Sequence, residues 1–358
     1  MRLVSLSMLK PDMVLAKSIY YRDCLVLKVG QTGLERYVRS LGNMGIDCVY
    51  VEDSKSDGIE IPDVISEETR VSCKRILRQT IEDFENKTVV EVSDLSDTIH
   101  SIIDDILACE DMQVSLNDIS ASDEYIFSHS VSTTVYSLLI ARRLGYSKSM
   151  MEKLAAGALF HDIGKIMLDK KVVNKAGTLN QEEADHIKLH TTIGYEVLKK
   201  CTSLTELSRI VSLYHHESMD GSGYPMGVNA GELHEIVRIV SVADTYDALI
   251  SDRCYRRKWS SNQAVNYLIE NAETKFDTKL VSVLIKQIAI YPNGSMVRIS
   301  DNSIGIIKEQ NKNFPLRPII RVIIDSNGNE VVPYELDMMK VLSITIIESE
   351  LEMNMDLI

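Results

Sequence analysis

Two short stretches of the sequence combine histidines and carboxylates in a pattern that could bind metal ions. The first is residues 161–165, with the sequence HDIGK, and the second is residues 215–225, with the sequence HHESMDGSGYP. Adjacent side chains on a helix point about 100° apart, so His215 and His216 cannot both face one apolar core. A histidine pair followed by a glycine-rich turn predicts a metal site with a shaped loop beside it.

Other histidines and aspartates of the central region fall on the apolar faces of predicted helices. Asp162 shares a stripe with Met151 and Ala155, where an unpaired buried carboxylate would cost several kcal/mol. Such side chains, coming from five segments, can converge only if the helices surround a common centre. The inward residues are His129, His161, Asp162, His190, His215, His216 and Asp244. Imidazole and carboxylate ligands without sulfur suit Fe or Mn, with Zn, Ni or Co as alternatives.

Each of these residues also has an ordinary structural interpretation. A single histidine on an apolar face is more often a hydrogen-bonded core residue. Two aspartates in one predicted helix, such as Asp244 and Asp247, usually form a solvated face or ion pairs. The combination of all seven residues is what favours a metal centre over these readings.

The two stretches resemble the signatures of the HD-GYP family, metal-dependent phosphodiesterases that act on cyclic di-GMP. Residues 161–165 match the HDxxK part and residues 215–225 match HHExxDGxGYP. The run 238–256 is similar to the segment that follows them in that family, and the resemblance covers roughly residues 117 to 292. Residues 9–13, with the sequence LKPDM, resemble a small input domain found ahead of many such enzymes.

The resemblance implies a binuclear metal centre. His129, His161, Asp162 and Asp244 would be the ligands shared with the wider HD hydrolase superfamily. The second metal would be held by His190, His215 and His216, with Asp162 bridging the two ions. Tyr125 stands where some relatives have a glutamate for a third metal, so we expect two ions, Fe or Mn.

A pair of metal ions can share a bridging hydroxide and polarise phosphoryl oxygens for in-line attack on a phosphodiester. We therefore expect hydrolysis of cyclic di-GMP to pGpG, with the further step to GMP left open. Asp162 and Lys165 are the expected catalytic residues. Lys165, one helical turn beyond Asp162, could reach a phosphate oxygen or protonate the leaving 3′-oxygen.

Further residues are expected to contact the substrate beside Lys165. Glycines let the backbone approach a ligand, tyrosine can stack on a guanine, and arginine pairs with phosphate or guanine. Asp247 could also orient a ligand or Lys165. The expected substrate-binding residues are Lys165, Gly221, Gly223, Tyr224, Asp247, Arg253 and Arg256.

Two alternatives to this enzyme stay open. One is a receptor that binds cyclic di-GMP with little or no turnover and signals through its flanking units. The other is an HD hydrolase for another cyclic dinucleotide, such as a mixed guanine–adenine one. The complete ligand set and Lys165 favour an enzyme, because a pure binder has no need of a hydroxide-generating metal pair.

Composition narrows the class of protein further. A net charge of −13 over 358 residues argues against a basic face for nucleic-acid polymers or anionic membranes. The six cysteines include no Cys-x-x-Cys pair, which argues against disulfide frameworks and thiolate zinc sites. Apolar runs are too short to span a bilayer and no signal segment opens the chain, so we expect a cytoplasmic protein.

The expected fold is mainly α, with an HD-superfamily helical bundle between two small units. Residues 1–62 predict an α/β input domain, 63–112 a helical connector, 113–292 the catalytic domain and 293–358 a small β unit. Residues 66 to 110 are also a candidate homodimer contact. At the local level, capping boxes are expected at Thr32 and Ser203, and the last helix of the bundle is expected to reach Tyr291 before Pro292.

Overall fold

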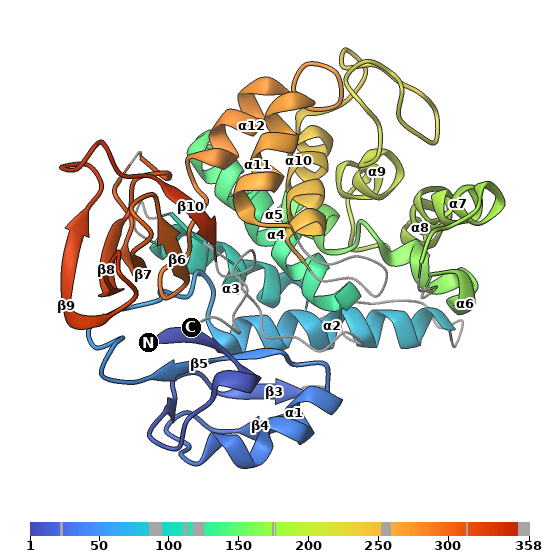
Figure 1. The fold of residues 1–358 in the computed structure, drawn as a ribbon. Helices are drawn as coiled ribbons and strands as arrows, with labels where there is room; N and C mark the ends of the chain where they lie inside the picture. Colours follow the sequence, from blue (N-terminus) through green and yellow to red (C-terminus); the bar gives the residue numbers. More distant parts are fainter. Residues whose placement is uncertain are drawn as a thin grey trace.

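The structure is a computed structural model, and it describes residues 1–21, 24–85, 95–109, 113, 114, 116, 125–173, 175, 177–251, 259–312 and 314–349. The fold is mainly helical, with a small α/β unit at the N-terminal end and a β unit at the C-terminal end, as predicted (Figure 1). No helix among the described residues is long and apolar enough to cross a membrane. The predicted boundaries between the units stay predictions.

The N-terminal unit consists of short strands and one short helix around its own apolar core. Strands β1, β5 and β2 form an antiparallel sheet in that order, and β3 pairs with β4. Its elements are β1 (Arg2–Ser5), β2 (Val14–Leu15), β3 (Ile19–Tyr21), β4 (Cys24–Leu27), α1 (Val38–Asn43) and β5 (Cys48–Glu52). The predicted capping box at Thr32 is wrong, because the chain enters a 3-10 helix at Gly33, whose φ of 66° suits glycine.

The helical body follows, and the connector helices are part of its core. Its described helices range from 4 to 19 residues in length. The elements are α2 (Glu67–Glu85), α3 (Leu95–Ala108), α4 (Tyr125–Arg143), α5 (Lys148–Leu159), α6 (Lys170–Val173), α7 (Gln181–Lys188), α8 (His190–Leu198), α9 (Glu206–Tyr214), α10 (Glu235–Ile250), α11 (Ser261–Glu270) and α12 (Thr278–Ile285). One continuous apolar core joins them, including Tyr136 of α4 stacked edge-on against Tyr246 of α10.

Two predicted helix ends in this body are wrong. Helix α9 is capped by Thr205, whose hydroxyl accepts from the backbone N–H of Ser208, while the Ser203 hydroxyl lies beside Cys201. Helix α12 ends at Ile285, well before Tyr291. Residues 287 and 289 use their backbone groups to bond to Val114 instead, which removes them from any helix.

A five-stranded antiparallel sheet forms the C-terminal unit, in the order β10-β6-β7-β8-β9. Its strands are β6 (Met296–Ile299), β7 (Ile304–Glu309), β8 (Ile319–Ile324), β9 (Glu330–Asp337) and β10 (Ile346–Ser349). The unit contacts the N-terminal unit, and the two lie next to each other beside the helical body (Figure 1). Leu3 donates its N–H to the Gly294 carbonyl at 3.1 Å, and Lys55 forms an ion pair with Glu330 at 2.7 Å.

A close backbone approach brings the two histidine-containing stretches together. The 3-10 helix Ile163–Met167 packs against α8 at two glycines. A Cβ on Gly164 would lie 2.0 Å from the His190 carbonyl oxygen, and one on Gly194 would lie 2.4 Å from the Ser212 hydroxyl. That hydroxyl donates to the His161 carbonyl at 2.9 Å. Only glycine at these positions lets α8 and α9 come this close to the HDIGK segment.

Substituting Gly164→Ala should therefore disturb the placement of His190. We expect a loss of about 1–3 kcal/mol in the free energy of unfolding, the usual cost of overpacking, and less metal bound per chain. Urea denaturation and metal analysis would measure both. Gly42→Ala is the matched control, because a Cβ there meets nothing within 4 Å. If Gly164→Ala and Gly42→Ala had the same free energy of unfolding and the same metal content, the close approach at Gly164 would not need glycine.

Candidate metal centre

Five helical segments deliver their polar side chains to one buried point. His129 lies on the first turns of α4, while His161 and Asp162 directly follow α5. His190 begins α8, His215 is the C-cap of α9 with His216 next to it, and Asp244 lies on α10. All are buried except His216, whose side chain is 27% exposed. The structure thus brings together all seven predicted ligands, and their role as ligands stays a prediction.

Backbone carbonyls set the orientation of three of the histidine rings. The Nδ1 atom of His161 lies 2.7 Å from the Ala158 carbonyl, that of His190 lies 2.7 Å from the Ile187 carbonyl, and that of His215 lies 3.0 Å from the Ser212 carbonyl. A carbonyl only accepts, so each Nδ1 carries the proton and donates it. When such a ring is neutral, as His190 is, its Nε2 atom offers a lone pair to the centre.

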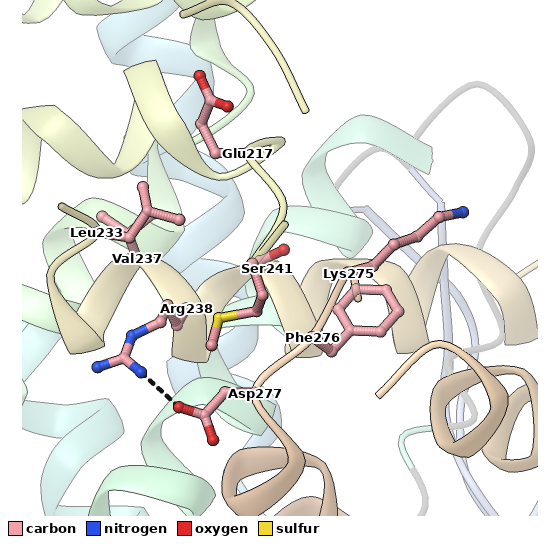
Figure 2. Close-up of a pocket in the computed structure, with 9 residues that line it drawn as sticks. Glu217, Leu233, Val237, Arg238, Ser241, Lys275, Phe276 and Asp277 are labelled. Carbon is pink, nitrogen blue, oxygen red and sulfur yellow. Dashed lines mark hydrogen bonds and ion pairs between the residues drawn. The ribbon is translucent and has the colours of Figure 1, made fainter. Parts of the chain in front are cut away.

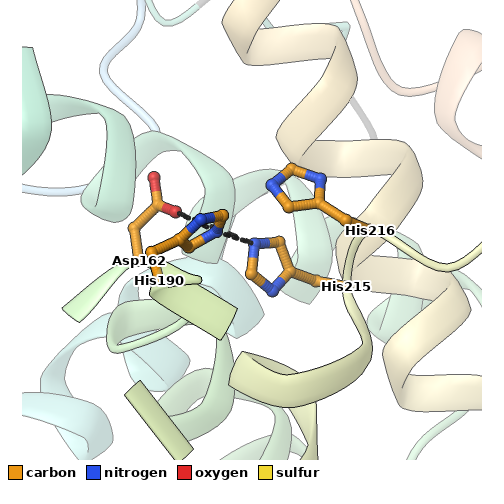
Figure 3. Close-up of side chains that lie close together, drawn as sticks. All are labelled: Asp162, His190, His215 and His216. Carbon is orange, nitrogen blue, oxygen red and sulfur yellow. Dashed lines mark hydrogen bonds and ion pairs between the residues drawn. The ribbon is translucent and has the colours of Figure 1, made fainter. Parts of the chain in front are cut away.

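Several of the atoms that face one another at the centre are hydrogen-bond acceptors, so they lack donors to pair with. The Nε2 atoms of His190 and His215 lie 3.3 Å apart, and both are within 4 Å of Asp162 Oδ1 (Figure 3). Among the described residues, neither Asp162 Oδ1 nor His161 Nε2 has a hydrogen-bond partner. Lone pairs converging in a buried space repel unless a cation lies between them. The donor set therefore fits a metal ion.

A second group of donors adjoins the first through Asp162. His129 Nε2 lies 2.9 Å from Asp244 Oδ1 and 3.8 Å from Asp162 Oδ2. His161 Nε2 lies 3.4 Å from Asp162 Oδ2 and 3.6 Å from Asp244 Oδ1. One donor atom from each of His129, His161 and Asp162 lies within 4.8 Å of the others, as do those of Asp162, His190, His215 and His216. Asp162 belongs to both groups, which fits two ions sharing one carboxylate.

Charges in the metal-free site already suit metal binding for several of these groups. Burial opposes ionisation of Asp162, but Lys165 and His161 outweigh it and hold the pKa of that carboxyl well below its usual range. Burial also lowers the pKa of His190 to about 3, so this ring is neutral. For His161 burial is outweighed by the carboxylates of Asp162 and Asp244, which raise its pKa to about 10.

Lys165 and Asp247 differ in their positions relative to the centre. Lys165 Nζ lies 2.5 Å from Asp162 Oδ2 and its side chain is 18% exposed, so it borders both the carboxylate and solvent. Asp247 is buried and accepts from His129 Nδ1 at 2.7 Å. It therefore orients His129 from behind, the alternative role considered from the sequence, and does not face the open side of the site.

The loop over the centre is formed by residues 218–227. Tyr224 packs its ring against that of His216, with ring centres 4.8 Å apart, and donates its backbone N–H to the His216 carbonyl at 3.2 Å. A Cβ on Gly223 would lie 2.4 Å from Glu217 Cα, so the close approach that needs glycine here is to the chain's own backbone. Gly221 has a φ of 79°, which suits a glycine turn. Arg253 and Arg256 lie outside the described residues, as does the side chain of Tyr125.

The sequence assigned no role to Glu217, although it stands inside the second signature. Its side chain is buried, and Oε1 accepts the backbone N–H groups of Met226 at 2.7 Å and Gly227 at 3.0 Å. Glu217 also lines a small cavity of about 10 Å³, the size of one water molecule, together with Arg238 and Asp277 (Figure 2). An acidic residue directly after two inward histidines is the signal that could have indicated this anchor.

Comparison with known proteins shows what this site is similar to. Residues 113–280 match the model described as an HD domain, and residues 296–355 match a KOW domain associated with the HD domain. The part of the chain that carries the converging residues is therefore similar to the HD domain. The resemblance to its HD-GYP members, predicted from the two signatures, is confirmed.

Several curated relatives are phosphodiesterases by name. A cyclic di-GMP phosphodiesterase of Pseudomonas aeruginosa is 29% identical over 247 residues, 69% of this chain and 59% of the relative. A cyclic di-GMP phosphodiesterase of Borreliella burgdorferi is 30% identical over 59% of this chain and 55% of its own length. A 3′3′-cGAMP-specific phosphodiesterase of Vibrio cholerae is 34% identical over 49% of this chain and 38% of its own length. This chain thus spans only part of each relative.

Among solved structures, an HD-GYP-type protein of Bdellovibrio bacteriovorus aligns with a TM-score of 0.49 and 17% identity. The alignment covers 79% of this chain and 97% of that structure.

Metal affinity should rise with pH, because His161 must lose a proton to bind. Its pKa of about 10 keeps it protonated at neutral pH in the metal-free protein, while a metal needs the neutral Nε2. Affinity for Mn²⁺ should therefore increase by up to about tenfold per pH unit between pH 7 and 9, with proton release. Calorimetry in buffers of different ionisation enthalpy would count the protons. His100→Gln, at a surface pair with Glu152, should leave that count unchanged. An affinity independent of pH would contradict this reading.

Glu217→Ala should loosen the loop over the centre. Removing a buried acceptor of two backbone N–H groups should cost about 1.5–3 kcal/mol in the free energy of unfolding, and loop residues should exchange their amide hydrogens faster. Glu217→Gln keeps one acceptor oxygen and should lose less. Hydrogen exchange at residues 218–227 measures the effect, and unchanged protection in Glu217→Ala would show that the carboxylate does not hold the loop.

Proposed function

We propose that this protein is a metal-dependent phosphodiesterase that hydrolyses cyclic di-GMP to linear pGpG, with GMP as the further product if a second cleavage follows. The observation that carries the proposal is the convergence of acceptor atoms from His190, His215 and Asp162 on one buried centre. The match to the HD domain and the names of the relatives support the same class of reaction.

The residues that would hold the ions are the two groups joined by Asp162. His129, His161 and Asp244 would complete one site with it, and His190, His215 and His216 would complete the other. A pair of Fe or Mn ions bound there would supply an activated water and polarise the phosphoryl oxygens of the substrate. Asp247 would keep the His129 ring in place during turnover, because it holds the ring nitrogen that points away from the centre.

In the proposed reaction, Lys165 is the proton donor. It contacts Asp162, one of the shared ligands, and still reaches solvent, so it lies where a substrate phosphate would meet the centre. From this place the ammonium would bind a phosphoryl oxygen and deliver a proton to the leaving 3′-oxygen. Tyr224 and the loop of residues 218–227 would cover the site beside His216 and reduce the access of bulk water.

A mixed guanine–adenine cyclic dinucleotide is a second candidate substrate. The observation that favours it is the 34% identity to a 3′3′-cGAMP-specific phosphodiesterase of Vibrio cholerae. Both substrates have the same phosphodiester ring and differ in one base, so the same metal centre would serve either.

Protein purified without oxygen would test the proposal through its metal content and its turnover of cyclic di-GMP and 3′3′-cGAMP. We expect about two transition-metal ions per chain in the wild type, following the two donor groups. Asp162→Ala should lose both metal and turnover, because it removes the shared carboxylate. Asp104→Ala is the control, since this exposed residue pairs only with Lys148 at the surface among its described contacts.

The outcomes separate the candidates. Turnover of one dinucleotide over the other identifies the substrate, while metal loading and tight binding without turnover of either would make the protein a receptor. A wild-type protein that binds no metal would overturn the metal centre itself.

A further inference from the structure

A lysine with no assigned role lies against the loop that covers the metal centre. Lys188 is the last residue of α7, two positions before His190. Its Nζ lies 5.8 Å from the centre of the Tyr224 ring, and that ring packs against His216. The Lys188 side chain is 42% exposed, whereas His190 is fully buried. The ammonium therefore lies at the solvent edge of the site.

The contacts of Lys188 among the described residues contribute little to the stability of the fold. Its ion-pair partner is Asp185, one turn earlier on the same helix at 2.7 Å, and that carboxylate is also exposed. Exposed pairs of this kind contribute little to stability, because water and salt screen them. Lys188 can therefore exchange Asp185 for another anion at little cost.

Resting on the proposed function, we propose that Lys188 binds the second phosphate of the cyclic dinucleotide while the first lies at the metal centre beside Lys165. The substrate carries two phosphodiesters on opposite sides of one macrocycle, and only one of them can occupy the His/Asp cluster. The other would lie toward the mouth of the site. A chain with a net charge of −13 repels a dianion unless local cations offset that charge.

Position also favours this role for Lys188. Lys188 reaches the Tyr224 ring from the same chain segment that supplies His190. The part of a bound ligand that extends out of the buried cluster past Tyr224 would therefore lie beside Lys188. The lysine would then act on binding and not on bond cleavage. Its loss should raise KM and leave kcat nearly unchanged, the signature of an interaction made equally in ground and transition states.

Lys199 provides a matched control within the same region of the fold. It pairs with Glu196 three residues earlier at 2.7 Å, and its Nζ lies 4.6 Å from the centre of the Tyr195 ring. Its side chain is 45% exposed. Lys199 thus has the same kind of neighbours as Lys188, but it follows α8 at the end opposite His190.

The experiment compares Lys188→Gln and Lys199→Gln in the metal-loaded full chain on two substrates, cyclic di-GMP and bis(p-nitrophenyl) phosphate, which has a single phosphate. We expect Lys188→Gln to raise KM for cyclic di-GMP between about threefold and tenfold, the range between exposed and charge-assisted contacts. High salt should shrink this difference. The single-phosphate substrate should be unaffected, Lys188→Arg should restore KM, and Lys199→Gln should match the wild type.

Other results would overturn the inference. An unchanged KM in Lys188→Gln, or equal losses on both substrates, would mean that Lys188 does not contact a second phosphate, while the proposed function would stand. If the wild type turns over no cyclic dinucleotide, the proposed function fails on its own, and calorimetric binding of cyclic di-GMP then tests Lys188. Binding that is absent, or equal in wild type and Lys188→Gln, would overturn the role.

Discussion

The structure of the site depends on one buried carboxylate, that of Asp162. It lies within 4 Å of ring nitrogens from His129, His161, His190 and His215, and it also pairs with Lys165. A buried charge with one unsatisfied oxygen is costly unless cations surround it. The helical body meets that demand by directing histidines from α4, α8 and α9 toward this carboxylate.

The rest of the helical body serves to keep this arrangement rigid. Glycines at 164 and 194 allow the backbones of the HDIGK segment and α8 to touch, and backbone carbonyls hold three imidazole rings with their Nε2 atoms inward. The loop over the centre is anchored by Glu217. Side chains held in this way would need little rearrangement to act as the proposed metal ligands.

The C-terminal unit shares the apolar core of the helical body, whereas the N-terminal unit has a core of its own. The connector helix α2 packs against α4, where Arg78 lies 4.9 Å from the centre of the Phe127 ring, two residues before His129. The C-terminal sheet contacts the N-terminal unit through pairs such as Leu3 with Gly294. These contacts connect both flanking units with the helical body that carries the seven converging residues.

The sequence by itself determined the resemblance to HD-GYP proteins, through its two signatures, and the mainly helical fold. It also indicated the seven inward residues, because helical periodicity decides which side chains share a face. It could not decide where helices end when neighbouring residues compete, as at Thr205 and at residues 287–289. Only the tertiary structure decided that Asp247 supports His129 from behind, that Glu217 anchors the loop and that Lys188 reaches Tyr224. These contacts join segments distant in the chain, and no local pattern records which segments will meet.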